Sequence, residues 1–152
     1  FRRWLPPFHS SHPTELNMDQ QEQEQIGQIA INWFRSTTKS EEEAQKMLSG
    51  LVHMVKEDGA KLVHLGNVLF LILVQGKGVV EVHTIGTEAQ PRMLADDFKK
   101  LAAYLKQIGV KMAYTYTPDN RYGRLAQMTG LKVKQFKAKV EGQMNNVYAL
   151  EL

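Results

Sequence analysis

Apolar residues recur every three to four positions in the first part of the chain, which predicts two successive helices. The first helix spans residues 17–35. The second begins after Ser40, where Glu43 completes a capping box, and it ends near Gly59, which suits a C-terminal cap. The apolar stripe of the first helix consists of Ile26, Ile29, Ala30, Trp33 and Phe34.

Further along the chain, the spacing of apolar residues changes between a period of two residues, typical of strands, and one of 3.6 residues, typical of helices. This pattern predicts six strands and two more helices. A long helix begins at Pro91 and ends at Gly109, and a short helix follows the turn at residues 118–120 and ends at Gly130. The strands are predicted at residues 61–65, 68–74, 79–85, 111–117, 131–138 and 143–150. The first three are close in sequence and therefore predict an antiparallel meander.

Residues 1–16 show neither period, and three prolines interrupt regular hydrogen bonding there. Basic and aromatic residues stand among the prolines, which favours an extended arm that binds a partner, with a floppy terminus as the alternative. The residues predicted to contact the partner are Arg2, Arg3, Trp4, Leu5 and Phe8. Residues 17–152 are predicted to form one domain.

Composition excludes several classes of site and adds little about partners. The chain has no cysteine, so it has no disulfide framework, cysteine nucleophile or thiolate zinc site, and no other metal-ligand spacing is present. The longest apolar run, residues 68–74, is too short to span a membrane, and no signal peptide is visible. The net charge of +3 is too mild to predict a nucleic-acid partner.

The order of elements resembles the GNAT (N-acetyltransferase-like) superfamily over residues 17–152. In that superfamily two helices precede a meander, then a long helix, a strand, a short helix and a closing hairpin. Only the first strand of the family has no clear counterpart. The most specific part is residues 111–136, where the turn at Asp119-Asn120 and the pair Gly130-Leu131 are similar to a family motif that usually ends in Gly-Phe. The resemblance implies an α/β (α+β) fold with a mixed, mostly antiparallel sheet flanked by four helices.

The resemblance also implies a place for the diphosphate of acyl-CoA, between the central strand and the long helix. Backbone N–H groups at a helix N-terminus suit an anion, and the family signature there is Gln/Arg-x-x-Gly-x-Gly/Ala. This chain has residues 86–93 instead: the paired glycines are missing, Pro91 lacks an N–H, and Glu88 adds a negative charge that Arg92 partly offsets. If a cofactor binds, the residues expected to hold it are Ile85, Gly86, Thr87, Arg92 and Asn120.

Candidate catalytic residues lie on the third strand and the short helix. Glu81 and His83 alternate with valines and share one strand face, where they could deprotonate an amine or form a solvated surface. The family's tyrosine on the short helix falls at Ala126 or Gln127. Tyr122 is the possible substitute, and a packing role is its alternative.

Because both diagnostic features depart from the family, we predict a non-catalytic structural or interaction protein on a GNAT-like scaffold. The chain is similar to GNAT-like virion proteins of tailed phages, which implies a phage virion component in the particle or the host cytoplasm. It would bind other protein subunits through its arm, without cofactor, membrane or nucleic acid. The alternative is an acyl-CoA-dependent N-acetyltransferase that has a divergent loop and uses acetyl-CoA.

Overall fold

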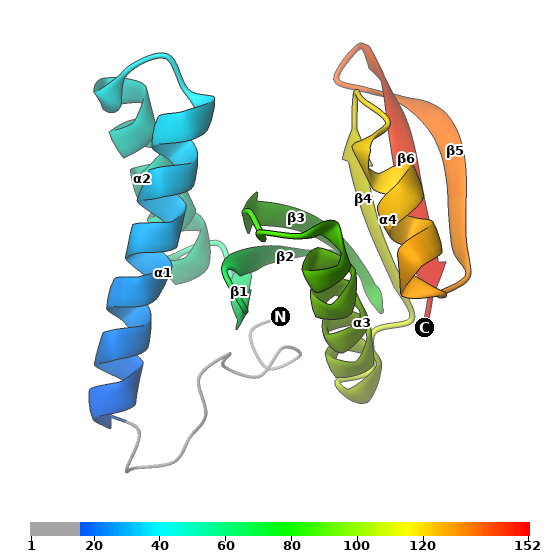
Figure 1. Ribbon diagram of the computed structural model, residues 1–152, viewed down its shortest axis with the longest axis horizontal. Helices are drawn as coiled ribbons and strands as arrows, with labels where there is room; N and C mark the ends of the chain where they lie inside the picture. Colours follow the sequence, from blue (N-terminus) through cyan, green and yellow to red (C-terminus); the bar gives the residue numbers. More distant parts are fainter. Residues whose placement is uncertain (1–15) are drawn as a thin grey trace. The chain divides into compact units, whose positions relative to one another are not determined.

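The computed structural model describes residues 16–152, with side chains from Gln20 onward. Its helices and strands follow the predicted order (Figure 1). They are α1 (Leu16–Thr37), α2 (Glu41–Lys56), β1 (Lys61–Leu65), β2 (Val68–Gly76), β3 (Val79–Gly86), α3 (Pro91–Gln107), β4 (Met112–Thr117), α4 (Arg121–Thr129), β5 (Val133–Val140) and β6 (Gln143–Glu151). In this part of the chain no helix is long and apolar enough to cross a membrane.

The predicted arm lies outside the described residues, apart from Leu16, which begins α1. All the residues predicted to contact a partner lie outside the described part of the chain. They are Arg2, Arg3, Trp4, Leu5 and Phe8. The arm and its role therefore stay a prediction.

The six strands are hydrogen-bonded in the order β1-β2-β3-β4-β6-β5. The pairs β1–β2, β4–β6 and β5–β6 are antiparallel, whereas β3 and β4 are parallel. Parallel strands need a crossover between them, and α3 provides it. The prediction of a mixed, mostly antiparallel sheet with four helices is confirmed.

The chain divides into two compact units, and the division passes through β2 and β3. The first unit contains the described residues up to Ile72 together with Thr84–Thr87. The second unit contains Leu73–His83 and Glu88–Leu152, so that β4, β5, β6, α3 and α4 all belong to it.

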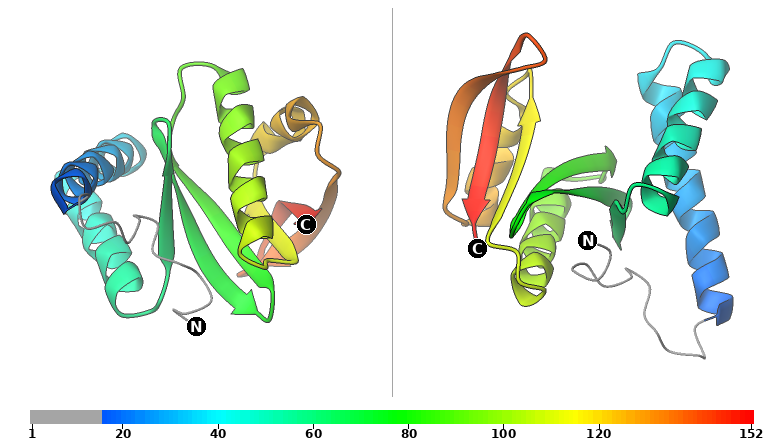
Figure 2. Two further views of the ribbon diagram at one scale, coloured as in Figure 1. Left: turned by 90° about the horizontal axis from the view of Figure 1, so that it is seen from below. Right: turned by 180° about the vertical axis from the view of Figure 1, so that it is seen from behind.

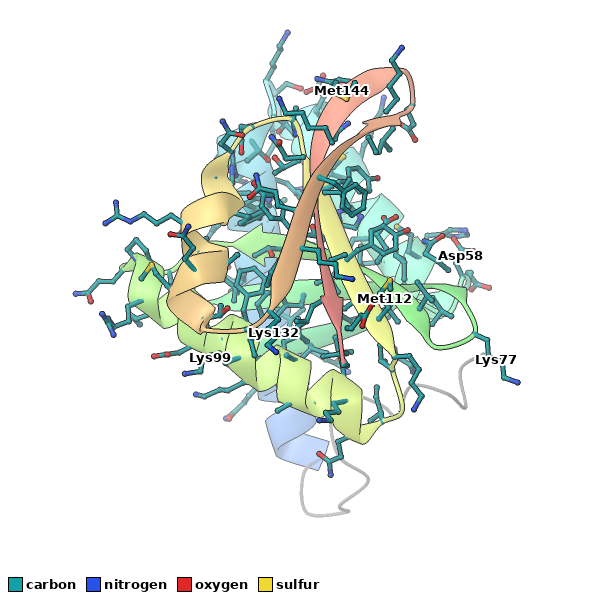
Figure 3. All side chains as sticks on the ribbon, turned by 90° about the vertical axis from the view of Figure 1, so that its right-hand side faces the viewer. Asp58, Lys77, Lys99, Met112, Lys132 and Met144 are labelled. Carbon is teal, nitrogen blue, oxygen red and sulfur yellow. The ribbon has the colours of Figure 1, made fainter. Side chains whose placement is uncertain are left out.

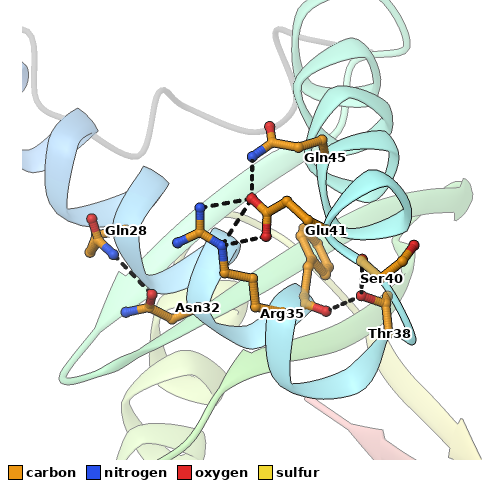
Figure 4. A network of polar contacts seen from close by, with 8 residues as sticks. Gln28, Asn32, Arg35, Thr38, Ser40, Glu41 and Gln45 are labelled. Carbon is orange, nitrogen blue, oxygen red and sulfur yellow. Dashed lines mark hydrogen bonds and ion pairs between the residues drawn. The ribbon is translucent and has the colours of Figure 1, made fainter.

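In the first unit, a network of polar contacts joins the end of α1 to the start of α2 (Figure 4). Arg35 donates two parallel hydrogen bonds of 2.9 Å to the Glu41 carboxylate. Ser40 caps α2 as predicted, because its hydroxyl accepts from the Glu43 N–H at 3.1 Å. The return bond of the capping box is displaced by one residue, since Glu43 Oε2 accepts from the Lys39 N–H.

In the second unit, α3 and α4 lie side by side and contact each other (Figures 1 and 2). Pro91 occupies the first turn of α3, where its missing N–H costs nothing, and Gly130 caps α4 with a left-handed φ of 70°. The buried aliphatic face of α3 includes Leu101 and Leu105. This unit carries the polar and apolar features from which the candidate site is built.

Candidate active site

The parallel strands β3 and β4 are paired over only a short stretch. Their register joins Val79 to Met112, Val80 to Ala113 and Glu81 to Tyr114. The ladder ends there, but both strands go on beyond it. Strand β3 continues to Gly86. Strand β4, whose first residue Met112 is labelled in Figure 3, continues to Thr117. Ligands in open α/β sheets bind at the carboxyl ends of parallel strands where the strands part.

A cluster of polar side chains occupies one sheet face at the end of this ladder. The Tyr114 hydroxyl donates to Glu81 Oε1 at 3.2 Å, and His83 Nε2 is hydrogen-bonded to Glu81 Oε2. The Tyr116 ring meets the His83 ring edge-on, with centroids 5.6 Å apart. Both oxygens of the Glu81 carboxylate therefore have a partner, and His83 is held between an acid and an aromatic ring.

Burial separates the roles of the residues in this cluster. The Glu81 side chain is 13% exposed and the His83 side chain 33%, so His83 is the more accessible of the two. Burial, and then the charge and hydrogen bond of Glu81, raise the pKa of Tyr114 to about 12. Burial and nearby carboxylates also raise the pKa of Tyr116. Both tyrosines consequently keep their protons at neutral pH, and Tyr114 remains a hydrogen-bond donor to Glu81.

The sequence predicted Glu81 and His83 on one face, and the structure brings them into contact. It missed Tyr114 and Tyr116, which complete the cluster from β4. The alternation Tyr114-Thr115-Tyr116 was visible in the sequence, but its meaning depends on the β3–β4 register.

Tyr122 does not join this cluster. It lines an apolar pocket together with Val82 and Thr115, which alternate with the cluster residues and so project from the opposite face of the sheet. Its ring stands edge-on to Phe98 and to Tyr148, with centroids 6.0 Å apart in each pair. The structure gives Tyr122 the packing environment that the sequence offered as its alternative.

Asn120 is engaged in a contact within the protein. Its Oδ1 accepts from Asn146 Nδ2 at 2.9 Å, and the same amide also donates to the Asp119 carbonyl at 2.8 Å. Asn120 stands at the N-cap of α4, but its side chain makes no capping hydrogen bond. The contact with buried Asn146 fixes the turn between β4 and α4, and the role of Asn120 in cofactor binding stays a prediction.

Gly86 is surrounded by the protein's own backbone in the first unit. It has a φ of 104°, and a Cβ there would lie 2.8 Å from the Asn67 carbonyl oxygen and 3.0 Å from Ile29 Cγ2. This position therefore requires glycine for packing, whatever ligand binds nearby. Ile85 is buried and Thr87 is exposed, and their contact with a cofactor is likewise a prediction.

The start of α3 has features that suit an anion. The first turn contains no acidic residue, Gln90 makes no side-chain cap, and Arg92 in that turn is exposed. Glu88 was expected to repel a diphosphate here. In the structure its carboxyl group is hydrogen-bonded to that of Asp97 within α3. The first turn of α3, with Arg92 and without an acidic residue, therefore suits the diphosphate of acyl-CoA.

Asp97 is a buried acidic group of the second unit. It is only 5% exposed, and its Oδ2 has no hydrogen-bond partner among the described residues. Burial, then the hydrogen bond and charge of Glu88, raise the pKa of Asp97 to about 7, while Lys100 acts in the opposite direction. Burial beside a second carboxyl group therefore favours the protonated form of Asp97 in the folded protein.

Asp97→Asn is expected to change how stability depends on pH. Between the unfolded pKa of about 3.8 and the folded pKa of about 7, only the folded state keeps the Asp97 proton, so wild-type stability falls as pH rises. The variant lacks this loss and should gain on the order of 2–4 kcal/mol over wild type from pH 4 to pH 8. Urea unfolding across this range measures it. Asp96→Asn, at the exposed neighbouring position, should keep most of the wild-type slope, because the charge of Asp96 is the smallest of the causes that raise the pKa of Asp97.

The sequence matches no protein-family model and no curated protein. The fold, in contrast, is similar to that of solved acetyltransferases. A probable acetyltransferase of the GNAT family from Chromobacterium violaceum is 13% identical and has a TM-score of 0.60, over 82% of this chain and 81% of that chain. The chain has the GNAT fold.

Two other acetyltransferases share this GNAT fold at low sequence identity. Spermidine N-acetyltransferase SpeG from Vibrio cholerae is 10% identical, with a TM-score of 0.56 over 84% of this chain and 89% of that chain. The microcin C7 self-immunity acetyltransferase MccE was solved in complex with acetyl-CoA and AMP. It is 14% identical, with a TM-score of 0.55 over 84% of this chain and 83% of that chain. At such low sequence identities, the similarity shows that the fold is shared.

These GNAT structures correct the function predicted from the sequence. The prediction of a non-catalytic virion protein is wrong, because the similar structures are acetyltransferases and favour the alternative of an acyl-CoA-dependent enzyme. The narrower likeness to phage virion proteins finds no support in them. The expectation of no cofactor is unsupported as well, since MccE was solved with acetyl-CoA.

Proposed function

We propose that the chain is an acyl-CoA-dependent N-acyltransferase. The observation that carries this proposal is the position of the Glu81–His83–Tyr114 cluster. It lies where β3 and β4 part in a GNAT fold, at the end of their short ladder. A base at this point would face an amine that approaches the parted strands.

The cluster can take a proton from an amine. With Nε2–H of His83 donated to Glu81 Oε2, the Nδ1 lone pair of His83 is able to accept the ammonium proton. Glu81 stabilises the resulting imidazolium, and the Tyr114 hydroxyl fixes the other oxygen of Glu81. Because His83 is the more exposed member, it is the group that meets the substrate, and Glu81 and Tyr114 position it.

Acyl-CoA would supply the acyl group as a thioester, with its diphosphate at the first turn of α3 beside Arg92. The transfer forms a bond between the amine nitrogen and the acyl carbon and breaks the carbon–sulfur bond. The substrate nitrogen gives up two protons: its ammonium proton leaves through His83 to solvent before the attack, and a second leaves as the amide forms. The released thiolate takes up one proton, so that one proton is released to solvent overall. Tyr122 has no part in this scheme, since it lies on the opposite face of the sheet.

Calorimetric titration with CoA, acetyl-CoA, butanoyl-CoA and hexanoyl-CoA tests the proposal. At least one acyl-CoA is expected to bind with a Kd between about 1 μM and 1 mM, and at 100 times that Kd it should stabilise the protein by about 2.7 kcal/mol. Thiol release in the presence of a polyamine or a lysine peptide then reports transfer. If none of these compounds binds at millimolar concentration, the proposed function is wrong.

A further inference from the structure

An apolar pocket of about 100 Å³ lies within the second unit, between α3, α4 and the sheet. Its floor includes Val82 of β3 and Thr115 of β4. Each of these residues directly follows the last pair of the β3–β4 ladder, which joins Glu81 to Tyr114. The pocket therefore reaches the sheet at the point where β3 and β4 separate. The polar cluster lies at that same point on the opposite face.

The pocket offers almost no hydrogen bonds to a ligand. Its walls include aliphatic groups and the rings of Phe98 and Tyr122. The hydroxyl of Thr129, one of the few polar groups in the lining, already donates to the Ala126 carbonyl at 2.6 Å and accepts from the Leu131 N–H at 3.2 Å. A hydrocarbon group fits such a lining, whereas a charged or hydrogen-bonding group does not.

We propose that this pocket binds the hydrocarbon chain of an acyl-CoA longer than acetyl-CoA, which makes the enzyme selective for short to medium acyl chains. The inference rests on the proposed function. The amine must lie on the face that carries Glu81 and His83, because its proton leaves there. On the opposite face, the apolar pocket is left for the acyl chain of a thioester held between the strands.

The size of the pocket sets the length of the chain. An engineered apolar cavity of about 150 Å³ binds benzene, which has six carbons. By the same ratio of volume to carbon atoms, a pocket of about 100 Å³ has room for roughly four carbons of an acyl chain. Hexanoyl, which adds four methylene groups to acetyl, is the longest linear chain expected to gain from the pocket.

The size of the side chain at position 131, just before β5, affects the space in the pocket. Leu131 lines it and directly follows Gly130, the left-handed cap of α4. Phenylalanine is larger than leucine, so Leu131→Phe should fill part of the pocket.

The test measures the Kd of each acyl-CoA by calorimetry in wild type and in pocket-filling variants. In wild type, each methylene added from acetyl to hexanoyl should tighten binding about fourfold, and octanoyl should add nothing. Leu131→Phe and, as a second variant at another wall, Ala126→Leu should abolish this gain while the Kd of acetyl-CoA stays within about twofold. Met128→Phe enlarges an exposed residue of the same helix and should leave the wild-type profile intact.

A Kd that is the same for acetyl-CoA and hexanoyl-CoA in wild type would overturn the inference and leave the proposed function standing. So would a chain-length gain that persists in both pocket-filling variants. Binding of free hexanoate as tight as that of hexanoyl-CoA would identify a fatty-acid site instead, which also overturns it. Failure of every acyl-CoA to bind is a different result, since it overturns the proposed function itself.

Discussion

Glu81→Gln is expected to lower kcat/KM for amine acylation by about 10²–10⁴-fold, the range that a positioned acid or base contributes. Glutamine is close in size to glutamate but carries no charge, so it cannot stabilise an imidazolium on His83. The Kd for acyl-CoA should change little, because the carboxylate lies with His83 and Tyr114 and not at the start of α3. Steady-state kinetics and calorimetry on the same preparation separate the two effects.

Tyr114→Phe is the matched control for this substitution. It removes the 3.2 Å hydrogen bond to Glu81 Oε1 and keeps both the ring and the carboxylate. Its expected loss is about tenfold, in keeping with one charge-assisted hydrogen bond. If Glu81→Gln were no slower than Tyr114→Phe, the carboxylate would have no role in proton transfer.

Gly86→Ala is expected to reduce the free energy of unfolding by about 3–5 kcal/mol, as the sum of backbone strain and overpacking. The φ of 104° is unfavourable for any residue with a Cβ. The new methyl group would also meet the Asn67 carbonyl oxygen at 2.8 Å and the Val68 Cα at 3.3 Å, and backbone atoms cannot move aside as a flexible side chain can. Urea unfolding followed by circular dichroism measures the loss.

Gly50→Ala provides the opposite expectation within the same unit. Gly50 lies inside α2, and nothing stands within 4 Å of the position that its Cβ would take. Alanine there should stabilise the protein by about 0.5–1 kcal/mol, because glycine is the poorer helix former. A Gly86→Ala variant as stable as wild type would show that the backbone around Asn67 is not packed as described.

Local patterns in the sequence were enough to predict the elements. Ser40 with Glu43, Pro91 and Gly130 each mark a helix end through chemistry that acts over a few residues, and all three operate in the structure. One prediction at this level was off by two residues: the C-cap of α2 is Glu57, and Gly59 uses its φ of 77° in the connection to β1.

Half of the polar cluster could be predicted from the sequence, and the other half could not. The two-residue period of β3 places Glu81 and His83 on one face without further information. Tyr114 and Tyr116 join them only through the register of β4 against β3, a pairing across more than thirty residues. No local pattern carries that register, so the tyrosines were missed.

The prediction of a non-catalytic protein rested on two departures from the family, the missing glycines before α3 and the missing tyrosine on α4, and the similar acetyltransferase structures contradict it. A diphosphate needs N–H donors and a favourable charge at the start of α3, and the missing glycines do not remove these. Glu88 stands just before α3, and its partner Asp97 lies nine residues further on within that helix. The contact between the two carboxyl groups became visible only in three dimensions.

The short β3–β4 ladder has a consequence for motion within the second unit. Strand β4 is held to β6 by six ladder pairs and β6 to β5 by eight, whereas only three pairs join β4 to β3. We therefore expect the β3–β4 pairing to open more readily than the other two pairings. Such opening would let the parted strands widen for a bulky thioester and close again once the product has left.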